Sequence, residues 1–230
     1  MRVAREATIR FDLGLRESLG AGLRAQALVV QDDRNLRIGG FDSDELDGSD
    51  ELNAACSAIA AQIPLPLGRY LLCRRSTESA PELEYRAVVH DLEASPTCRP
   101  GNVRRSLVAI VEDAVKRDVS SLASDPLGSF KNRGLTLEEL VGAFDEAIVE
   151  LSVALRLPFR LTLLLDKLSQ VEEASHMLRS RVLRRASRSF RTVAGDAAVV
   201  EVRRRGARLH FRFVPGSLSG YMVTRVNHTA

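Results

Sequence analysis

The sequence predicts an α/β fold, a three-layer α/β/α sandwich around a mixed central sheet, followed by a C-terminal β-hairpin extension. Short apolar or alternating runs typical of strands take turns with longer amphipathic stretches typical of helices, in the order β-β-α-β-β-α-β-α-β-α. The 230 residues, of which 45% are hydrophobic, are enough to bury one sizeable core. We expect one domain over residues 1–190 and an extension over residues 191–230 that packs on it.

The first half of the chain begins with two strands. Residues 8–13 alternate between polar and apolar side chains, and residues 25–30 form an apolar run typical of a strand buried on both faces. A polar loop over residues 31–40 follows. Residues 50–63 predict a helix with Ser49 or Asp50 as its N-cap. Its apolar stripe consists of Leu52, Cys56, Ile59 and Ile63. The segment PLPLG ends this helix, and residues 69–74 and 84–91 are two further short strands.

The second half continues the alternation. Residues 102–117 form an amphipathic helix, residues 120–124 a short strand, and residues 125–134 a loop. A capping-box pattern at Thr136 and Glu139 opens a helix that runs to about residue 155. Residues 159–165 are a strongly apolar strand and residues 169–188 a helix. Residues 198–203 and 207–214 alternate around a central Arg-Arg-Gly, which predicts a β-hairpin.

The composition excludes several classes of protein. The apolar runs are far shorter than the roughly 20 residues of a membrane helix. The first residues show no apolar stretch of a secretory signal. Cys56, Cys73 and Cys98 are odd in number and widely spaced, so we interpret them as reduced thiols and expect a cytoplasmic protein. Neither a cofactor nor a metal is expected, because the chain has no phosphate-loop or dinucleotide fingerprint and its histidines lack metal-ligand spacing.

Motifs at the joints between the elements carry a resemblance. Residues 27–40 are similar to a strand and a first ligand loop, residues 66–69 (PLGR) to the entry of the next strand, and residues 85–90 (YRAVVH) to a Y-V-I-H strand. Residues 125–135 (DPLGSFKNRGL) are similar to a phosphate loop. In this order they resemble the macro domain family of ADP-ribose-binding modules, over about residues 8–183. The N-terminal domain of leucine aminopeptidases shares this architecture and is the alternative.

The resemblance implies a set of ligand-binding residues. Asp12 would hold the adenine amino group, and Asn35, Gly39 and Gly40 would lie on the side of the distal ribose. The phosphates would be bound by the second loop, through Gly128, Ser129, Lys131, Arg133 and Gly134.

The sequence departs from the family in both loops. Gln-Asp-Asp-Arg at residues 31–34 replaces the asparagines of the first loop, and Asn35 is one residue out of register with the last of them. Bulky residues replace glycines in the second loop, and six acids between residues 42 and 51 disfavour an anionic ligand. We therefore expect a non-catalytic binding or interaction module with degenerate ADP-ribose loops. The alternative is a working reader of ADP-ribose or a related nucleotide, and an ADP-ribosyl hydrolase would need the missing asparagine.

Charge is unevenly distributed although the net charge is only +3. Between residues 179 and 212 there are eleven arginines and two acids. Four of these arginines share one face of the last helix at i, i+3, i+4, i+7 spacing: Arg181, Arg184, Arg185 and Arg188. A solvated helix face is the simplest interpretation. The alternative for this face is binding to a nucleic-acid backbone or to an acidic protein surface. For the module as a whole, a protein partner or a neighbouring domain is expected as an alternative to a nucleotide.

Overall fold

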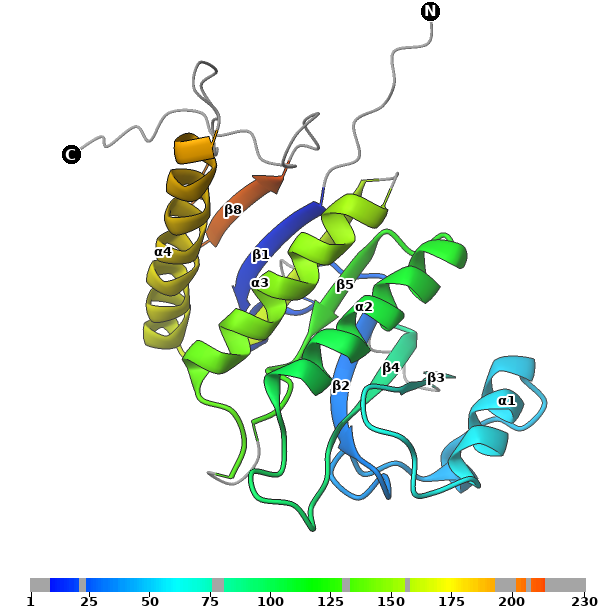
Figure 1. The fold of residues 1–230 in the computed structure, drawn as a ribbon. Coiled ribbons are helices and arrows are strands. Elements are labelled where there is room, and N and C mark those ends of the chain that lie inside the picture. Colours follow the sequence, from blue (N-terminus) through cyan, green and yellow to red (C-terminus); the bar gives the residue numbers. More distant parts are fainter. Residues whose placement is uncertain are drawn as a thin grey trace, which may run out of the picture.

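The computed structural model describes residues 9–20, 24–75, 81–129, 133–155, 158–192, 202–205 and 208–213. The elements follow the predicted order (Figure 1). The strands are β1 (Ile9–Leu15), β2 (Ala27–Asp33), β3 (Tyr70–Arg74), β4 (Leu83–His90), β5 (Ser121–Ser124), β6 (Phe159–Leu165), β7 (Val202–Arg205) and β8 (Arg208–Phe213). The helices are α1 (Glu51–Ala60), α2 (Pro100–Lys116), α3 (Leu137–Ala154) and α4 (Leu168–Thr192), with short 3-10 turns η1 (Arg16–Ser18) and η2 (Ser43–Glu45).

The strands of the described residues form one mixed eight-stranded sheet in the order β3-β4-β2-β5-β6-β1-β8-β7. The five strands from β4 to β1 run parallel. The strands at both edges run antiparallel to their neighbours. Helical crossovers connect the parallel strands, which is the connection that parallel neighbours require. The predicted fold class, a mixed sheet in an α/β/α sandwich, is confirmed.

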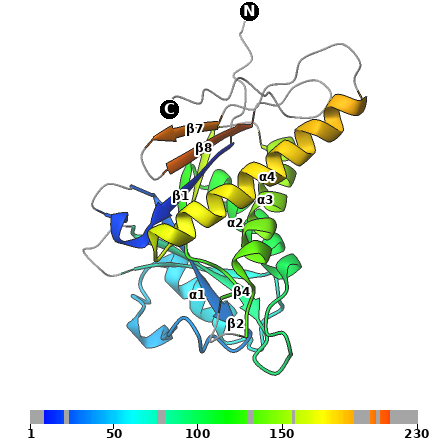
Figure 2. The same ribbon diagram turned by 90° about the vertical axis from the view of Figure 1, so that its left-hand side faces the viewer.

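Helices cover both faces of the sheet. Helices α2, α3 and α4 lie side by side on one face, and α1 lies on the other (Figures 1 and 2). Strand β3 shows the two faces, because Leu72 belongs to the main core and its neighbours Leu71 and Cys73 to a second core cluster with Cys56 of α1. The main core lies between the sheet and the three helices, and it contains the stacked rings of Phe11 and Phe144.

The local signals for helix ends are confirmed at two of the helices. Asp50 caps α1 by accepting hydrogen bonds from the backbone N–H groups of Leu52 and Asn53. Thr136 and Glu139 form the reciprocal capping box of α3. These bonds satisfy backbone donors that have no partner inside a helix.

The predicted apolar stripe of α1 is wrong in part. The helix ends at Ala60, and Ile59 and Ile63 are exposed by 42% and 49%. Cys56 is buried against β3. Helix α1 packs mainly on the edge strand β3, and the cluster around Cys56 consists of Leu71 and Cys73 of β3, Val88 of β4, Leu36 and Leu65. Ile59 and Ile63 do not belong to it.

The hairpin of β7 and β8 extends the sheet. Strand β8 pairs antiparallel with β1 from Ile9↔Phe213 to Asp12↔His210. The predicted hairpin is therefore present, and it adds strands to the same sheet. The division of the chain at residue 190 stays a prediction, since α4 continues to Thr192. No helix in the described part of the chain has the length and apolar character to cross a membrane.

Candidate functional site

The candidate site lies where the strand connections diverge. From β2 the chain passes through α1 to β3, and from the neighbouring β5 it passes through α3 to β6 on the opposite side. Ligands of open α/β sheets bind in the crevice at such a switch point, outside the carboxyl ends of the strands. These ends lie at the bottom of Figure 1, with the first turns of α2 and α3. We call residues 34–50 loop 1 and residues 125–136 loop 2.

Loop 1 is organised around the carboxylate of Asp33. Strand β2 extends to Asp33, although residues 31–40 are predicted to form a loop, and Asp32 and Asp33 are both fully buried. The Asp33 carboxylate accepts hydrogen bonds from the backbone N–H groups of Asn35 (3.1 Å), Arg37 (2.6 Å) and Ile38 (3.1 Å). These bonds hold a tight turn in which Leu36 has a left-handed conformation with φ of 59°, which is unfavourable for a branched side chain.

Asp32 binds the end of the same loop. Its Oδ1 accepts from the N–H groups of Ile38 (3.1 Å) and Gly39 (3.2 Å), and its Oδ2 lies 3.2 Å from Nη1 of Arg86. Arg86 also donates to the carbonyl of Gly39 (3.0 Å) and forms an ion pair with Glu84 (2.8 Å). Burial raises the pKa of Asp32, against the opposing effect of the N–H donors and Arg86.

Gly39 is required by this close packing. A Cβ atom on Gly39 would lie 2.6 Å from Nη1 of Arg86 and 2.7 Å from Oδ2 of Asp32. Neither group can move without breaking the bonds that they form with the loop. At Gly39 the backbone of loop 1 therefore packs directly against the side chains of Asp32 and Arg86, in the way that a glycine-rich loop packs against a ligand.

Gln31 connects loop 1 to loop 2. Its Oε1 accepts from the N–H of Gly128 (2.8 Å), and its Nε2 donates to the carbonyl of Ser129 (2.6 Å). The same Oε1 lies 3.0 Å from Nε2 of His90, whose Nδ1 lies 3.3 Å from Oγ1 of Thr97. This side chain spans the crevice between β2 and β5. It also uses the N–H of Gly128, a donor that the resemblance assigns to a ligand phosphate.

His90 is a buried, neutral histidine. Burial lowers its pKa to about 4, against the opposing charge of Asp33. Both ring nitrogens have hydrogen-bonding partners within the protein. These contacts are typical of a structural histidine.

The structure brings most of the predicted site residues to the crevice. Asn35, Gly39 and Gly40 lie in loop 1, and Gly128, Ser129, Arg133 and Gly134 in loop 2. Lys131 lies outside the described residues. Asp12 is apart from them, because it lies within β1, paired with Thr162 of β6. It is buried and lies 3.1 Å from Nε of Arg10 and 3.9 Å from Nε of Arg160.

A cluster of ion pairs lies at the carboxyl ends of β1, β5 and β6. Arg16, directly after β1, lies 2.8 Å from Asp125 and 2.9 Å from Asp166. Asp125 follows β5 and Asp166 follows β6. Burial raises the pKa of Asp125, while Arg16 opposes this effect. The carboxyl ends of these strands are thus joined by the protein's own ion pairs.

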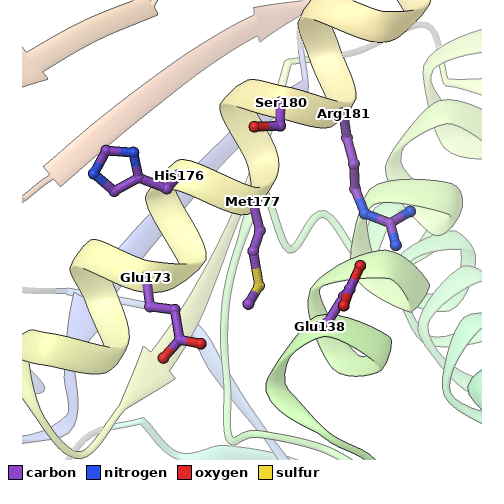
Figure 3. Close-up of a pocket in the computed structure, with 6 residues that line it drawn as sticks. All are labelled: Glu138, Glu173, His176, Met177, Ser180 and Arg181. Carbon is purple, nitrogen blue, oxygen red and sulfur yellow. The ribbon is translucent and has the colours of Figure 1, made fainter.

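A shallow groove of about 350 Å³ lies between α3 and α4 (Figure 3). It is lined by Glu138, Glu173, His176, Met177, Ser180 and Arg181. Arg181 approaches α3, where a Cβ on Gly142 would lie 2.7 Å from its Nη2, and its Nη1 lies 4.0 Å from the buried Asp145. This contact places Arg181 against the protein. The side chains of Arg184, Arg185 and Arg188 lie outside the described residues.

Among the described residues no group of three or more His, Cys, Asp or Glu side chains could hold a metal ion.

Sequence reasoning missed the residues that fill the crevice: Gln31, Asp32, Asp33, Glu84 and Arg86. The available signal was the replacement of the first-loop asparagines by Gln-Asp-Asp. Asp at the end of a strand often accepts from the backbone of the following turn.

Comparisons with known proteins establish the fold. No protein-family model and no curated protein matches the chain. A structure of the Oceanobacillus iheyensis macrodomain with ADP covers 80% of this chain and 96% of its own, at 12% identity and a TM-score of 0.53. A variant of that macrodomain with ADPR covers 79% and 97%, at 11% identity and a TM-score of 0.55. The macro domain of ganglioside induced differentiation associated protein 2 covers 72% and 82%, at 10% identity and a TM-score of 0.50. The chain has the macrodomain fold.

Proposed function

We propose that the chain is a non-catalytic binding or interaction module, built on the macrodomain fold, whose crevice is occupied by its own side chains. A macrodomain that binds ADP-ribose in this crevice is the second candidate, because the fold is similar to macrodomains solved with ADP and with ADPR. The two candidates differ in whether the loop N–H groups are available to a ligand.

The observation that carries the first candidate is the pairing of loop 1 with Asp32 and Asp33. Their carboxylates take the N–H groups of four residues: Asn35, Arg37, Ile38 and Gly39. A hydrogen bond to a charged group contributes about 1.5–3 kcal/mol, so a ligand that displaced all four would lose about 6–12 kcal/mol of existing interactions. Micromolar binding is worth about 8 kcal/mol in total. A diphosphate would also approach two buried carboxylates.

The crevice also supports a non-catalytic role. A general base must reach the proton that it abstracts, and the ring nitrogens of His90 are instead bonded to Gln31 and Thr97. The buried free thiols Cys56, Cys73 and Cys98 fit a reducing compartment, so we keep the cytoplasm as the proposed location.

Isothermal titration with ADP-ribose, ADP and AMP tests the proposal, with the Oceanobacillus iheyensis macrodomain titrated in parallel as the positive control. The expected result is no heat of binding at millimolar ligand from a sample that unfolds cooperatively. Micromolar binding of ADP-ribose would refute it. If Asp12→Ala then abolished that binding, the nucleotide-reader candidate would hold, with Asp12 as a ligand-binding residue.

A further inference from the structure

Five arginines gather around the carboxyl end of β4, beside the crevice. They come from four segments that are far apart in sequence, with Arg99 and Arg105 both at or in the N-terminal part of α2. We call them the β4-end patch: Arg34, Arg69, Arg99, Arg105 and Arg133. None of them belongs to the arginine-rich C-terminal region that the sequence emphasises.

Backbone hydrogen bonds bring three of these segments to β4. The N–H of Arg34 donates to the carbonyl of His90 (3.1 Å), and the N–H of Val88 donates to the carbonyl of Arg69 (2.9 Å). Arg99 follows Cys98, which forms a β-bridge with His90. All three arginines therefore lie within a few residues of the same strand end.

The other two arginines adjoin the first three. Arg105 of α2 packs on Gly68, where an added Cβ would lie 3.1 Å from its side chain, and this places it next to Arg69. The carbonyl of Arg133 accepts the N–H of Thr97 (3.3 Å) and so lies next to Arg99. These contacts connect the segments that carry the five arginines, from the start of β3 through the N-terminal part of α2 to loop 2.

Three of the five cations are available to a partner. Arg34 forms an ion pair with Asp91 (3.2 Å), and Arg105 donates to the side chain of Asn102 (2.8 Å). Arg69, Arg99 and Arg133 are exposed. The described residues provide no hydrogen bond or ion pair to their side chains. Among the described acids, Asp91, which is paired, and Glu93 follow the end of β4, and the charge of Glu139 acts on Cys98, the residue before Arg99.

The surroundings of the patch favour nucleic acid over protein as its partner. The buried core of a protein interface is apolar and aromatic, although arginine is also enriched there, whereas nucleic-acid interfaces are more polar and much more basic. Three large hydrophobic side chains are exposed among the described residues: Ile59 and Ile63, in or just after α1, and Leu168 at the start of α4. Ile63 is the one near the patch, two residues before Leu65, which is hydrogen-bonded to Arg34. Among residues 24–75, 81–129 and 133–155, which the structure describes, no exposed aromatic ring accompanies the arginines, so the described surface does not support stacking on single-stranded bases.

We propose that the β4-end patch binds the phosphate backbone of a duplex nucleic acid without reading its sequence. Guanidinium groups form paired hydrogen bonds with phosphate oxygens. Contacts to phosphate alone position a protein on a duplex and carry no sequence information. The patch borders the crevice, because Arg34 belongs to loop 1 and Arg133, which is also a predicted ligand-binding residue, belongs to loop 2, whereas Arg69 and Arg99 lie outside both loops. The inference concerns contacts with the phosphates of a duplex and not the binding of a nucleotide between the loops.

Fluorescence anisotropy with a labelled mixed-sequence DNA duplex, over a series of salt concentrations, tests the inference. The test variant is the triple change Arg69→Gln, Arg99→Gln and Arg133→Gln. In a plot of log affinity against log salt concentration, the slope falls by about 0.9 for each phosphate contacted. The variant should therefore bind the duplex at least tenfold more weakly, and the magnitude of its slope should be smaller by about 3.

The matched control neutralises three arginines at the opposite end of the sheet. Arg24 precedes β2, Arg117 follows α2, and Arg160 lies at the start of β6. The triple change of these residues to Gln alters the net charge equally and should leave affinity and slope near those of the unmodified protein. Thermal unfolding of both variants establishes that each one is folded.

Four results would overturn the inference. The unmodified protein could fail to bind duplex at low salt, or the two triple variants could weaken binding equally. Neutralising Arg184, Arg185 and Arg188 could abolish binding that the β4-end variant retains. Finally, the protein could bind a poly-glutamate peptide through the patch and no duplex, which would make the surface a protein-binding one.

Discussion

Replacing Asp33 with alanine tests whether this carboxylate organises loop 1. Asp33 accepts three backbone N–H groups at 2.6–3.1 Å and is fully buried. Hydrogen bonds to a charged group contribute about 1.5–3 kcal/mol each, and water can replace part of this at the half-buried loop. We expect Asp33→Ala to lower the free energy of unfolding by about 3 kcal/mol. For a chain of this size that corresponds to a fall in Tm of about 6–12 °C.

Asp47→Ala is the matched control. Asp47 also accepts a backbone N–H and a hydroxyl hydrogen bond two residues ahead, both from Ser49, but it is exposed. Water replaces its bonds at little cost, so Tm should barely change. Thermal unfolding followed by circular dichroism measures both variants. Hydrogen exchange should show faster exchange at Arg37 and Ile38 in Asp33→Ala. Equal Tm values for the two variants would refute the role assigned to Asp33.

Three further predictions use other buried groups. Gly39→Ala places a Cβ 2.7 Å from Oδ2 of Asp32 and should cost about 1–3 kcal/mol in urea unfolding, whereas Gly48→Ala meets no atom within 4 Å and should cost far less. Burial lowers the pKa of His90 to about 4. As the pH falls, the His90 ring is therefore protonated in the unfolded chain before it is protonated in the folded protein. Stability should therefore fall by about 2 kcal/mol from about pH 7 to 5, and His90→Gln should flatten this dependence. Burial raises the pKa of Cys98 to about 12, so a thiol reagent at mildly alkaline pH should label it only after unfolding.

The order of elements could be predicted because it depends on local periodicity. Alternating or apolar runs identified the strands, and amphipathic runs identified the helices. Caps were predictable for the same reason, since Thr136 and Glu139 are three residues apart and bond to each other directly. The end and the buried face of α1 were predicted less accurately. The apolar pattern extends to Ile63, whereas the helix ends at Ala60 and Ile59 is exposed, because burial depends on which tertiary neighbours are present.

The crevice could not be predicted from local pattern. Gln-Asp-Asp at the end of β2 is typical of a solvated loop, and the reasons for its burial lie far away in sequence. Arg86, which pairs with Asp32, is 54 residues later, and Gly128, which donates to Gln31, is 97 residues later. A buried carboxylate needs such partners, because an unpaired charge would be strongly unfavourable in the interior.

The macrodomain fold and the chemistry of its crevice are separable in this chain. The switch point between β2 and β5 requires loops that turn sharply and expose backbone N–H groups, whatever those groups bind. In loop 1 the acceptors are carboxylates on β2 itself, so the loop is held without a ligand. Gln31 then fixes loop 2 to the same strand. Because these bonds satisfy the donors internally, we expect an anion to be recognised at exposed arginines that have no partner among the described residues: Arg69 and Arg99 beside the crevice and Arg133 in loop 2.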